Sequence, residues 1–466
     1  MIITGERSYN NVVSLAELAP DDYLIKPFTG EQLQARLIRA IYRKHILQKI
    51  YQQIERGDLM EAIAACKRIE QQQPAYMYDA LRFEGELLHS LGKHEEAEEV
   101  YRRVLEAKVV PWAKMGLAQA LKERGNFEEA EKLATQVTEE TPEYLSAYDF
   151  LSSVHEAQGK LEKAQQALQR AATISPNNTI RQRLVGDIAA RNKDLLTAER
   201  AYGKVLERHQ GSSLKGVDDF TNLSRVLVER GDVAASRKVI SELKREWRGD
   251  KQAEMASLVM ESLCLQQEGQ TDKAQQMVDQ ALTLHQQIQQ VAAETGKPTL
   301  QRLSVDLAHA CLVSGKQDTA QAILRQVAAE NNEDQHIIEH ITEVFRKTGN
   351  EDAGKALLDE VSTEIVNLNN KGVLAARAGD LEGAVELLIQ AVEQVPNLQF
   401  LVNASKAIFT LIDQKGWDQE LADRGLQYLR RAHAKDRNSP KVASARDLYT
   451  SVAKKNGQPI HEALGA

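Results

Sequence analysis

The feature that most constrains this chain is a segment of two short helices joined by a tight turn, which recurs along most of its length. The clearest copy runs from Trp112 to Pro142, WAKMGLAQALKERGNFEEAEKLATQVTEETP. Gly125 interrupts the helical pattern, because glycine readily adopts the left-handed backbone that reverses the chain. Pro142 ends the second helix, since proline lacks the N–H that a helix interior needs. Apolar residues recur every three or four positions on both sides of the turn, which predicts two amphipathic helices.

The same turn returns at intervals of 33 to 35 residues in the first half of the chain. A small residue stands five positions after most of these turns, and another stands seven positions before most of them, which lets two helices approach closely. Twelve positions after each turn comes an apolar residue that is expected to bury the seam to the next unit. The turns are expected at Gly57, Gly92, Gly125, Gly159, Lys193, Gly231, Gly269, Gly315, Gly349 and Gly379.

This pattern resembles the tetratricopeptide repeat, whose period near 34 residues carries a Gly-x-x-x-x-Ala turn and a closing proline. The resemblance implies a mainly α fold, a solenoid of helical hairpins over residues 46–440 with about ten to eleven repeats. Residues 441–466 are expected to form a capping helix and a frayed tail. The glutamine-rich run 286–290 is expected to lengthen one helix. The closing prolines are Pro74, Pro142, Pro176 and Pro396.

Composition restricts the function classes. The chain has 466 residues, with 59 Lys and Arg against 67 Asp and Glu, and its formal net charge of −8 argues against nucleic acid as the main partner. No segment reaches the roughly 20 apolar residues that a membrane-spanning helix needs, and no signal peptide is expected. Cys66, Cys264 and Cys311 stand far apart and are interpreted as small core residues. We therefore expect a cytoplasmic chain.

The first 45 residues do not follow the repeat. Tyr23–Ile25 is an apolar run that predicts a buried strand, and Ile2–Thr4 is a similar short run. Thr29 is a suitable N-cap, and Gln32 three residues later completes a capping box. The helix that begins there is expected to continue to Gly57, because nothing between the cap and that glycine interrupts it.

This segment resembles the C-terminal half of a response-regulator receiver domain, the phosphoacceptor module of two-component signalling. The resemblance implies that Thr4 contacts a phosphoryl group, that Tyr23 changes rotamer on switching, and that Lys26 pairs with the phosphoryl oxygens. The Lys26–Pro27 bond is expected to be cis. The family's phosphoacceptor aspartate belongs to earlier strands, so none is assigned in this chain. The matching residues are Ile3-Thr4 and the run Asp22 to Phe28.

Two strands alone do not make a stable sheet. The edge at Ile2–Thr4 is expected to be unpaired, and exposed edges attract further strands. Three arrangements remain open. The segment packs on the first repeat through the long helix; it pairs with a second copy, giving a homodimer through residues 1–56; or Met1 is an internal methionine and the true start lies upstream.

One pattern has the spacing of a metal site. His336 and His340 are the first and last residues of a His-x-x-Glu-His motif, which is found in inverted zinc peptidases. The two histidines share one face of the predicted helix, as zinc ligands would need to. Neighbouring isoleucines form the apolar face through which this helix is expected to pack. No third metal ligand can be assigned. The histidines are therefore interpreted as solvated helix surface, and no metal or cofactor is predicted. The Lys and Asn pairs by which some tetratricopeptide repeats hold a carboxylate do not occur at the corresponding slots, Arg82/Glu86, Met115/Gln119 and Asp149/Ser153.

These observations favour a non-catalytic adaptor in bacterial two-component-type signalling, with a protein partner in the concave groove of the repeats. Two alternatives remain open. One is a phosphorylation-dependent response regulator, part of a phosphorelay, whose N-terminal half is missing from this chain. The other is a zinc-dependent hydrolase at His336 and His340. The repeat spacing breaks at 209–219, at 295–298 and around Trp417, and such departures can bear on ligand choice.

Overall fold

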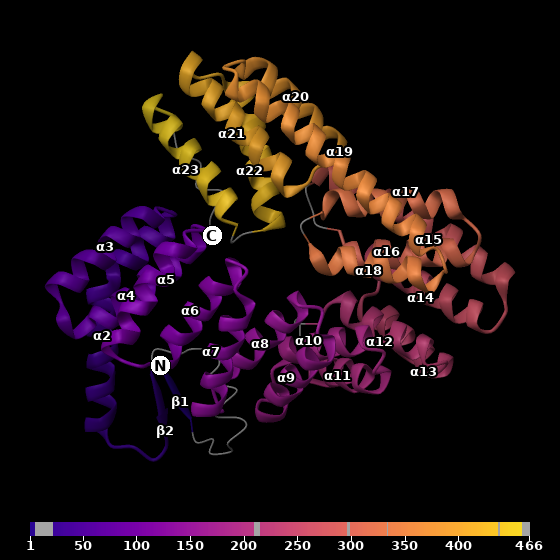
Figure 1. Ribbon diagram of the computed structural model, residues 1–466. Coiled ribbons are helices and arrows are strands. Elements are labelled where there is room, and N and C mark those ends of the chain that lie inside the picture. Colours follow the sequence, from indigo (N-terminus) through magenta and orange to yellow (C-terminus); the bar gives the residue numbers. More distant parts are fainter. Residues whose placement is uncertain (5–21, 209–214, 296–298, 333, 437–438, 459–466) are drawn as a thin grey trace. The chain divides into compact units, whose positions relative to one another are not determined.

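The computed structural model describes residues 1–4, 22–208, 215–295, 299–332, 334–436 and 439–458 (Figure 1). Contacts divide the chain into two compact units, Met1–Lys215 (unit 1) and Gly216–Ala466 (unit 2). The segment boundaries predicted at residues 45 and 440 are a different division of the chain and remain predictions.

Unit 1 begins with two short strands and continues as helical hairpins. From α4 onward each hairpin joins two helices of 13 or 14 residues, and each helix buries one apolar stripe. The elements are β1 (Ile2–Thr4), β2 (Tyr23–Ile25), α2 (Gly30–Arg56), α3 (Leu59–Gln72), η1 (Pro74–Tyr76), α4 (Met77–Ser90), α5 (His94–Ala107), α6 (Pro111–Glu123), α7 (Phe127–Glu140), α8 (Leu145–Ala157), α9 (Leu161–Ile174), α10 (Thr179–Arg191) and α11 (Leu195–Arg208).

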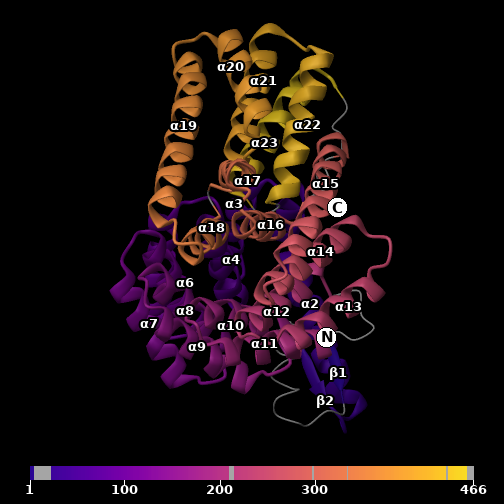
Figure 2. The same ribbon diagram turned by 90° about the vertical axis from the view of Figure 1, so that its right-hand side faces the viewer.

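Unit 2 repeats the hairpin with two unusually long helices, and Figure 2 shows one of them, α19, as a single continuous rod. Its elements are α12 (Val217–Glu229), α13 (Val233–Glu246), α14 (Lys251–Gln267), α15 (Thr271–Thr295), α16 (Gln301–Val313), α17 (Gln317–Glu330), α18 (Gln335–Lys347), α19 (Glu351–Arg377), α20 (Leu381–Gln394), α21 (Leu398–Lys415), α22 (Gln419–Lys435) and α23 (Pro440–Lys455). The capping helix predicted near the end is α23.

The predicted turns are confirmed. Each has a left-handed backbone, with φ between 62° and 86°. Nine are glycines, and the tenth is Lys193, the non-glycine residue with positive φ in the described part of the chain. A side chain at such a φ brings its Cβ close to the following carbonyl oxygen, so Lys193 carries strain that the glycines avoid.

The small residues at fixed slots are buried between helices, as predicted. Those five positions after the turns, from Ala62 to Ala384, are all buried. The ring of Tyr101 lies so close to Gly85 of α4 and Gly116 of α6 that an added Cβ would stand 2.5 and 2.3 Å from it. The prediction is wrong for Thr342, which is exposed, because α18 packs through the face that carries its buried apolar residues.

Two helices of unit 2 break the hairpin pattern. Helix α15 has 25 residues and contains the glutamine-rich run 286–290, as predicted. Helix α19 has 27 residues, because the second helix of one repeat continues directly into the first helix of the next. The repeat spacing had indicated two separate helices there. No proline stands between Val361 and Gly372 to end the first of them.

The N-terminal segment has the predicted elements. β1 and β2 form a parallel two-stranded sheet, in register from Ile2–Tyr23 to Thr4–Ile25. The capping box is present, since the Gln32 N–H donates to Thr29 Oγ1 at 3.2 Å and the Thr29 N–H donates to Gln32 Oε1 at 3.1 Å. Helix α2 then continues without a break to Arg56.

The two halves of α2 differ in burial. The second half packs on the first repeat and fully buries Leu47 and Ile50, which matches the first of the three predicted arrangements. The first half leaves Leu37, Ile38 and Ile41 exposed. The other two arrangements remain predictions.

The three cysteines are buried and free, as predicted for core residues. In the described part of the chain, every helix is too short or too polar to cross a membrane. The frayed tail was predicted from Lys454, but Lys454 and Lys455 still belong to α23, because the helix is continuous to that point. The loop predicted over 209–219 ends earlier than expected, since α12 begins at Val217. Residues 209–214, 296–298 and 459–466 lie outside the described residues.

Candidate binding surfaces

The residues predicted to form a receiver-type switch lie at the ends of the two strands. The Lys26 N–H donates a hydrogen bond of 2.8 Å to the Thr4 carbonyl, so these residues meet at the carboxyl end of the sheet. The Lys26–Pro27 peptide bond is cis, as predicted. Tyr23 pairs through its backbone with Ile2, and its side chain lies outside the described part. The switching roles of these residues remain predictions.

His336 and His340 lie one turn apart on α18. His336 is exposed, as predicted. The side chain of His340 is only 16% exposed, and its Nε2 lies 3.3 Å from Asp306 Oδ1 of α16. The interpretation of His340 as solvated surface is therefore wrong, because the packing of α18 on α16 brings a buried carboxylate to its ring. Within the described ranges, no group of three His, Cys, Asp or Glu residues is placed to hold a metal ion.

Asp306 is the centre of an ion-pair network on the first helices of unit 2. Its side chain is 2% exposed and accepts hydrogen bonds of 2.8 and 2.5 Å from the Arg225 guanidinium of α12. Burial opposes ionisation, but Arg225 and His340 outweigh it and hold the pKa of Asp306 well below its usual range. Burial and the nearby Lys347 lower the pKa of His309, one turn further along α16, to about 4.

These contacts connect first helices that belong to different repeats. Arg225 of α12 reaches Asp306 of α16 although α14 intervenes in the chain. Lys347 Nζ of α18 lies 2.6 Å from Glu229 Oε2 of α12. The polar side chains on this part of the first-helix face are therefore engaged with one another, and a partner would have to displace them.

The first helices of unit 1 also carry paired side chains at the slots compared in the sequence. Arg82 Nε donates to Glu86 Oε1 at 2.8 Å within α4. Asp149 of α8 accepts hydrogen bonds of 2.8 and 2.7 Å from Arg181 of α10, whose side chain is almost fully buried. The Asp149–Arg181 pair connects successive repeats and helps to align them, whereas the Arg82–Glu86 pair lies within one helix.

A cavity of about 1320 Å³ lies within unit 2. The two helices that break the hairpin pattern help to form it. The additional turns of α15 contribute Gln289 and Ala292, and the middle of α19 contributes Val361, Glu364 and Ile365. The other walls come from α16, α17, α18 and α20 to α22. Both irregular helices of unit 2 therefore contribute to the walls of the cavity.

Three basic side chains line this cavity, and they differ in whether they already form ion pairs. Arg325 is engaged, with its guanidinium 2.9 Å from Glu360 and 2.7 Å from Glu364. Arg431 and Lys435 lie one turn apart on α22, and neither makes a side-chain ion pair or hydrogen bond with the described residues. These two cations are available to an anionic group.

Part of this site was visible in the sequence. The interval between the turns at Gly269 and Gly315 is 46 residues, and the predicted break in spacing lies beside the cavity residues Thr299 and Gln301. The contribution of α19 was missed, because apolar periodicity alone does not show where one helix ends and the next begins. The absence of a closing proline did not reveal it, because α13 and α17 also end without one.

Comparison with known proteins identifies the repeat. Tetratricopeptide-repeat family models match residues 49–108 and 115–179 in unit 1 and residues 301–326 in unit 2. Curated relatives are the protein O-mannosyl-transferases TMTC1 of Mus musculus, 27% identical over 28% of this chain, and of Homo sapiens, 29% identical over 23%. The chain spans only 17% and 12% of the length of these relatives.

Similar solved structures are also repeat proteins. The C-terminal part of a repeat protein from Cytophaga hutchinsonii covers 63% of this chain and 98% of its own, with 12% identity and a TM-score of 0.37. A tetratricopeptide-repeat protein from Parabacteroides merdae covers 52% and 93%, with 17% identity and a TM-score of 0.33. The family matches begin at residue 49, so the receiver resemblance of residues 1–45 stays a prediction. The chain carries tetratricopeptide repeats in both of its compact units.

Proposed function

We propose that this chain is a non-catalytic scaffold that binds an extended segment of a protein partner in the cavity of unit 2. The observation that carries the proposal is the cavity itself, of about 1320 Å³. It exceeds the roughly 300–1,000 Å³ typical of pockets for small ligands, and so has room for several residues of a polypeptide. Solenoids of helical repeats bind partners along such extended surfaces.

The charged lining of the cavity is mixed, and within it Arg431 and Lys435 form a local basic site for an acidic side chain. The acidic lining residues are Glu330, Asp334, Glu364, Glu393 and Asp436, and the third basic residue is Arg325. The amides of Gln301 and Asn332 can donate and accept hydrogen bonds, as a peptide backbone does. Ile365 offers apolar contact. Arg431 and Lys435 can form charge-assisted hydrogen bonds with carboxylates of the segment.

The test reverses the charge of Arg431 and uses its neighbour as the control. Arg430 is exposed on the same helix but does not line the cavity, so Arg430→Glu makes the same charge change outside the site. Each variant replaces the native chain in its cells, and cross-linked partners are quantified by mass spectrometry. We expect Arg431→Glu to reduce capture of the partner about tenfold or more, and Arg430→Glu to retain it. Equal capture by the two variants would show that the cavity is not the binding site.

We further propose that the partner belongs to bacterial two-component-type signalling. Support comes from the resemblance of the segment with Thr4, Tyr23, Lys26 and Pro27 to a receiver domain, and from the contact between Thr4 and Lys26. The same capture experiment is expected to return a histidine kinase, a phosphotransfer protein or a receiver protein. Partners drawn wholly from other systems would contradict this assignment.

Residues 1–56 are also proposed to form a homodimer. Ile38 and Ile41 of α2 are 58% and 65% exposed, beside a sheet in which two strands are described. Exposed apolar patches and open strand edges favour association. Light scattering is expected to give a mass twice the 52.0 kDa of the chain. The double variant Ile38→Asp, Ile41→Asp should have the mass of a single chain. The control is Leu374→Asp on α19, an exposed leucine of unit 2, which should leave the mass unchanged.

A further inference from the structure

Glu84 of α4 occupies a position that most other repeats fill with an apolar side chain. It stands eight residues before the turn at Gly92, and its side chain is only 5% exposed. A carboxylate in such a position loses its hydration, which disfavours the charged form unless hydrogen bonds or cations compensate. The corresponding residues of six other repeats are buried and apolar, namely Leu117, Leu151, Val185, Leu223, Leu307 and Ile341.

The contacts of Glu84 compensate its burial incompletely. Its Oε1 lies 3.7 Å from Lys67 Nζ and its Oε2 lies 3.9 Å from the Arg103 guanidinium. Both distances are too long for a good hydrogen bond. Oε2 is buried and has no hydrogen-bond partner among the described residues. Burial raises the pKa of Glu84, although Lys67 and Arg103 oppose the rise.

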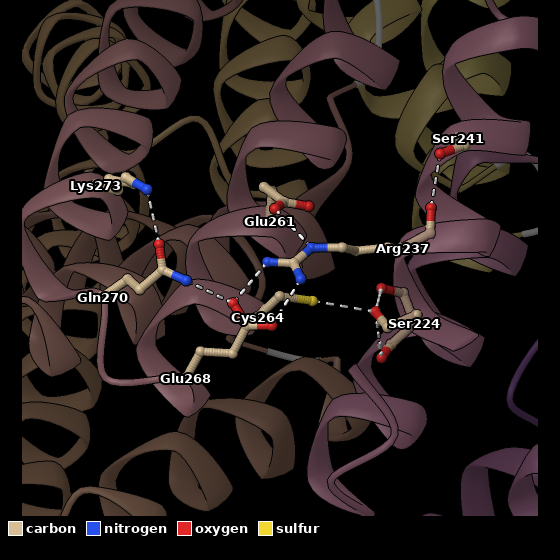
Figure 3. A network of polar contacts seen from close by, with 9 residues as sticks. Ser224, Arg237, Ser241, Glu261, Cys264, Glu268, Gln270 and Lys273 are labelled. Carbon is tan, nitrogen blue, oxygen red and sulfur yellow. Dashed lines mark hydrogen bonds and ion pairs between the residues drawn. The ribbon is translucent and has the colours of Figure 1, made fainter. Parts of the chain in front are cut away.

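Glu261 of α14 stands at the same slot, where its side chain is 24% exposed and hydrogen-bonded. Arg237 Nε of α13 donates a hydrogen bond of 3.0 Å to Glu261 Oε1 (Figure 3). Arg237 stands six residues after its turn, and the residue at that position in α3 is Ile63, which cannot donate. Glu84 therefore lacks the arginine that the preceding helix supplies to Glu261.

Glu84 lines a pocket of about 480 Å³ where α3, α4 and α5 meet. This volume is within the range of pockets that hold small groups. Leu88 and Val100 contribute apolar surface. The charged lining has two more acidic than basic residues, with Glu70, Glu84, Glu96 and Glu99 against Lys67 and Arg103.

We propose that this pocket receives a lysine or arginine side chain of a protein partner, with its cationic group on Glu84. The proposal rests on the proposed function as a protein-interaction scaffold. The aliphatic stem of the incoming residue packs on Leu88 and Val100, and its N–H groups donate to the Glu84 carboxylate. A metal ion fits less well, because no group of three ligands is placed to hold one among the residues that the structure describes.

The test compares labelled peptides that differ only in one side chain. Short alanine–glycine peptides carry arginine, lysine or citrulline at the centre, and citrulline has the shape of arginine without its charge. Binding to the full chain is followed by fluorescence anisotropy. We expect the two cationic peptides to bind about tenfold or more tightly than the citrulline peptide. Equal binding of all three peptides, or binding of none, overturns the proposal.

Three variants assign the preference to Glu84. Glu84→Gln keeps the size of the side chain, removes the charge and should abolish the preference. Glu84→Leu supplies the residue type of the other repeats and should do the same in a well-folded chain. Glu261→Gln is the matched control at the equivalent slot, where Arg237 already binds the carboxylate, and it should keep the preference. A preference that survives Glu84→Gln shows that the pocket is not the site.

The experiments distinguish a failure of the Glu84 pocket from a failure of the proposed binding site in the unit 2 cavity. Arg431→Glu should leave the peptide preference unchanged, since Arg431 belongs to the other unit. If Arg431→Glu removes the native partner while Glu84→Gln changes neither partner capture nor peptide binding, the scaffold stands and this pocket does not. If only Glu84→Gln matters, the cavity is not the partner site.

Discussion

At the scale of single residues, the turn at Lys193 shows how neighbouring helices impose a backbone conformation. The Lys193 N–H donates to the Ala190 carbonyl at 3.1 Å and the Asp194 N–H donates to the Ala189 carbonyl at 2.9 Å. The glycine turns make the same pair of bonds, for example around Gly125. Lysine therefore adopts the left-handed geometry because two packed helices require it.

Lys193→Gly is expected to be more stable than Lys193→Ala by about 1 kcal/mol. Both variants remove the same side chain, but only alanine keeps the Cβ that is strained at positive φ. The urea midpoint of helical circular dichroism measures the difference. If the alanine variant is as stable as the glycine variant, the strain at this turn is negligible.

Glu84→Leu is expected to raise the free energy of unfolding by about 1–2 kcal/mol, because it replaces an incompletely compensated buried carboxylate with apolar surface. Urea unfolding at pH 7 measures the gain. The raised pKa means that the folded state binds this proton more tightly than the unfolded chain does, so the gain should shrink as the pH is lowered toward 4.5. Glu261→Leu removes a formed hydrogen bond at the equivalent slot, and a similar gain there would contradict this account.

At the scale of helices, neighbouring helices approach closely where one of them carries a glycine, which has no side chain. Tyr101 of α5 fits between Gly85 of α4 and Gly116 of α6 because neither glycine has a Cβ. The sequence pattern predicted the slot at Gly85. It did not predict Gly116, since this residue lies outside the repeating positions and only the contact with Tyr101 explains it.

Gly116→Ala is expected to destabilise the chain by about 1–3 kcal/mol, because its methyl group would overlap the Tyr101 ring. The control is Gly203→Ala on α11, where an added Cβ meets nothing within 4 Å. The free energy of unfolding of that variant should rise by about 0.5–1 kcal/mol, because alanine has a higher helix propensity than glycine. Thermal and urea midpoints compare the two. Equal shifts of the same sign would mean that propensity, and not the contact with Tyr101, decides both.

At the scale of the whole molecule, repeats that look alike in sequence stack into units with different interiors. In unit 1, Asp149 and Arg181 join the first helices of successive repeats. In unit 2, the network of Arg225, Asp306 and His340 joins first helices two repeats apart. The network of unit 2 contains a histidine, so the stability of unit 2 should depend on pH.

Acidification is expected to destabilise unit 2 between pH 6.5 and 4. The pKa of His309 is lowered from 6.5 to about 4 in the folded chain, so the unfolded chain takes up this proton first. Stability is fully present above pH 6.5 and is lost as the pH falls toward 4. Burial lowers the pKa of His340 as well, which acts in the same direction. Urea midpoints at several pH values should fall less for His309→Gln than for the unmodified chain, and parallel curves would contradict the assignment.

Features that depend on neighbouring residues were determined by the sequence itself. The turn positions, the buried slots after them, the capping box at Thr29 and the strand at Tyr23–Ile25 were predicted, because each is set by local backbone preferences and by the apolar period of a helix. The same information indicated where the spacing breaks beside α15.

Only the tertiary structure decided which distant side chains meet. Arg225 and Asp306 are 81 residues apart, and no local pattern marks them as partners. His340 was interpreted as a surface residue, and no sequence pattern marked Glu84 as buried. The physical reason is that stacking determines which helix faces come together. That stacking depends on small differences in packing at each seam, which accumulate along the array and which the period of the sequence does not record.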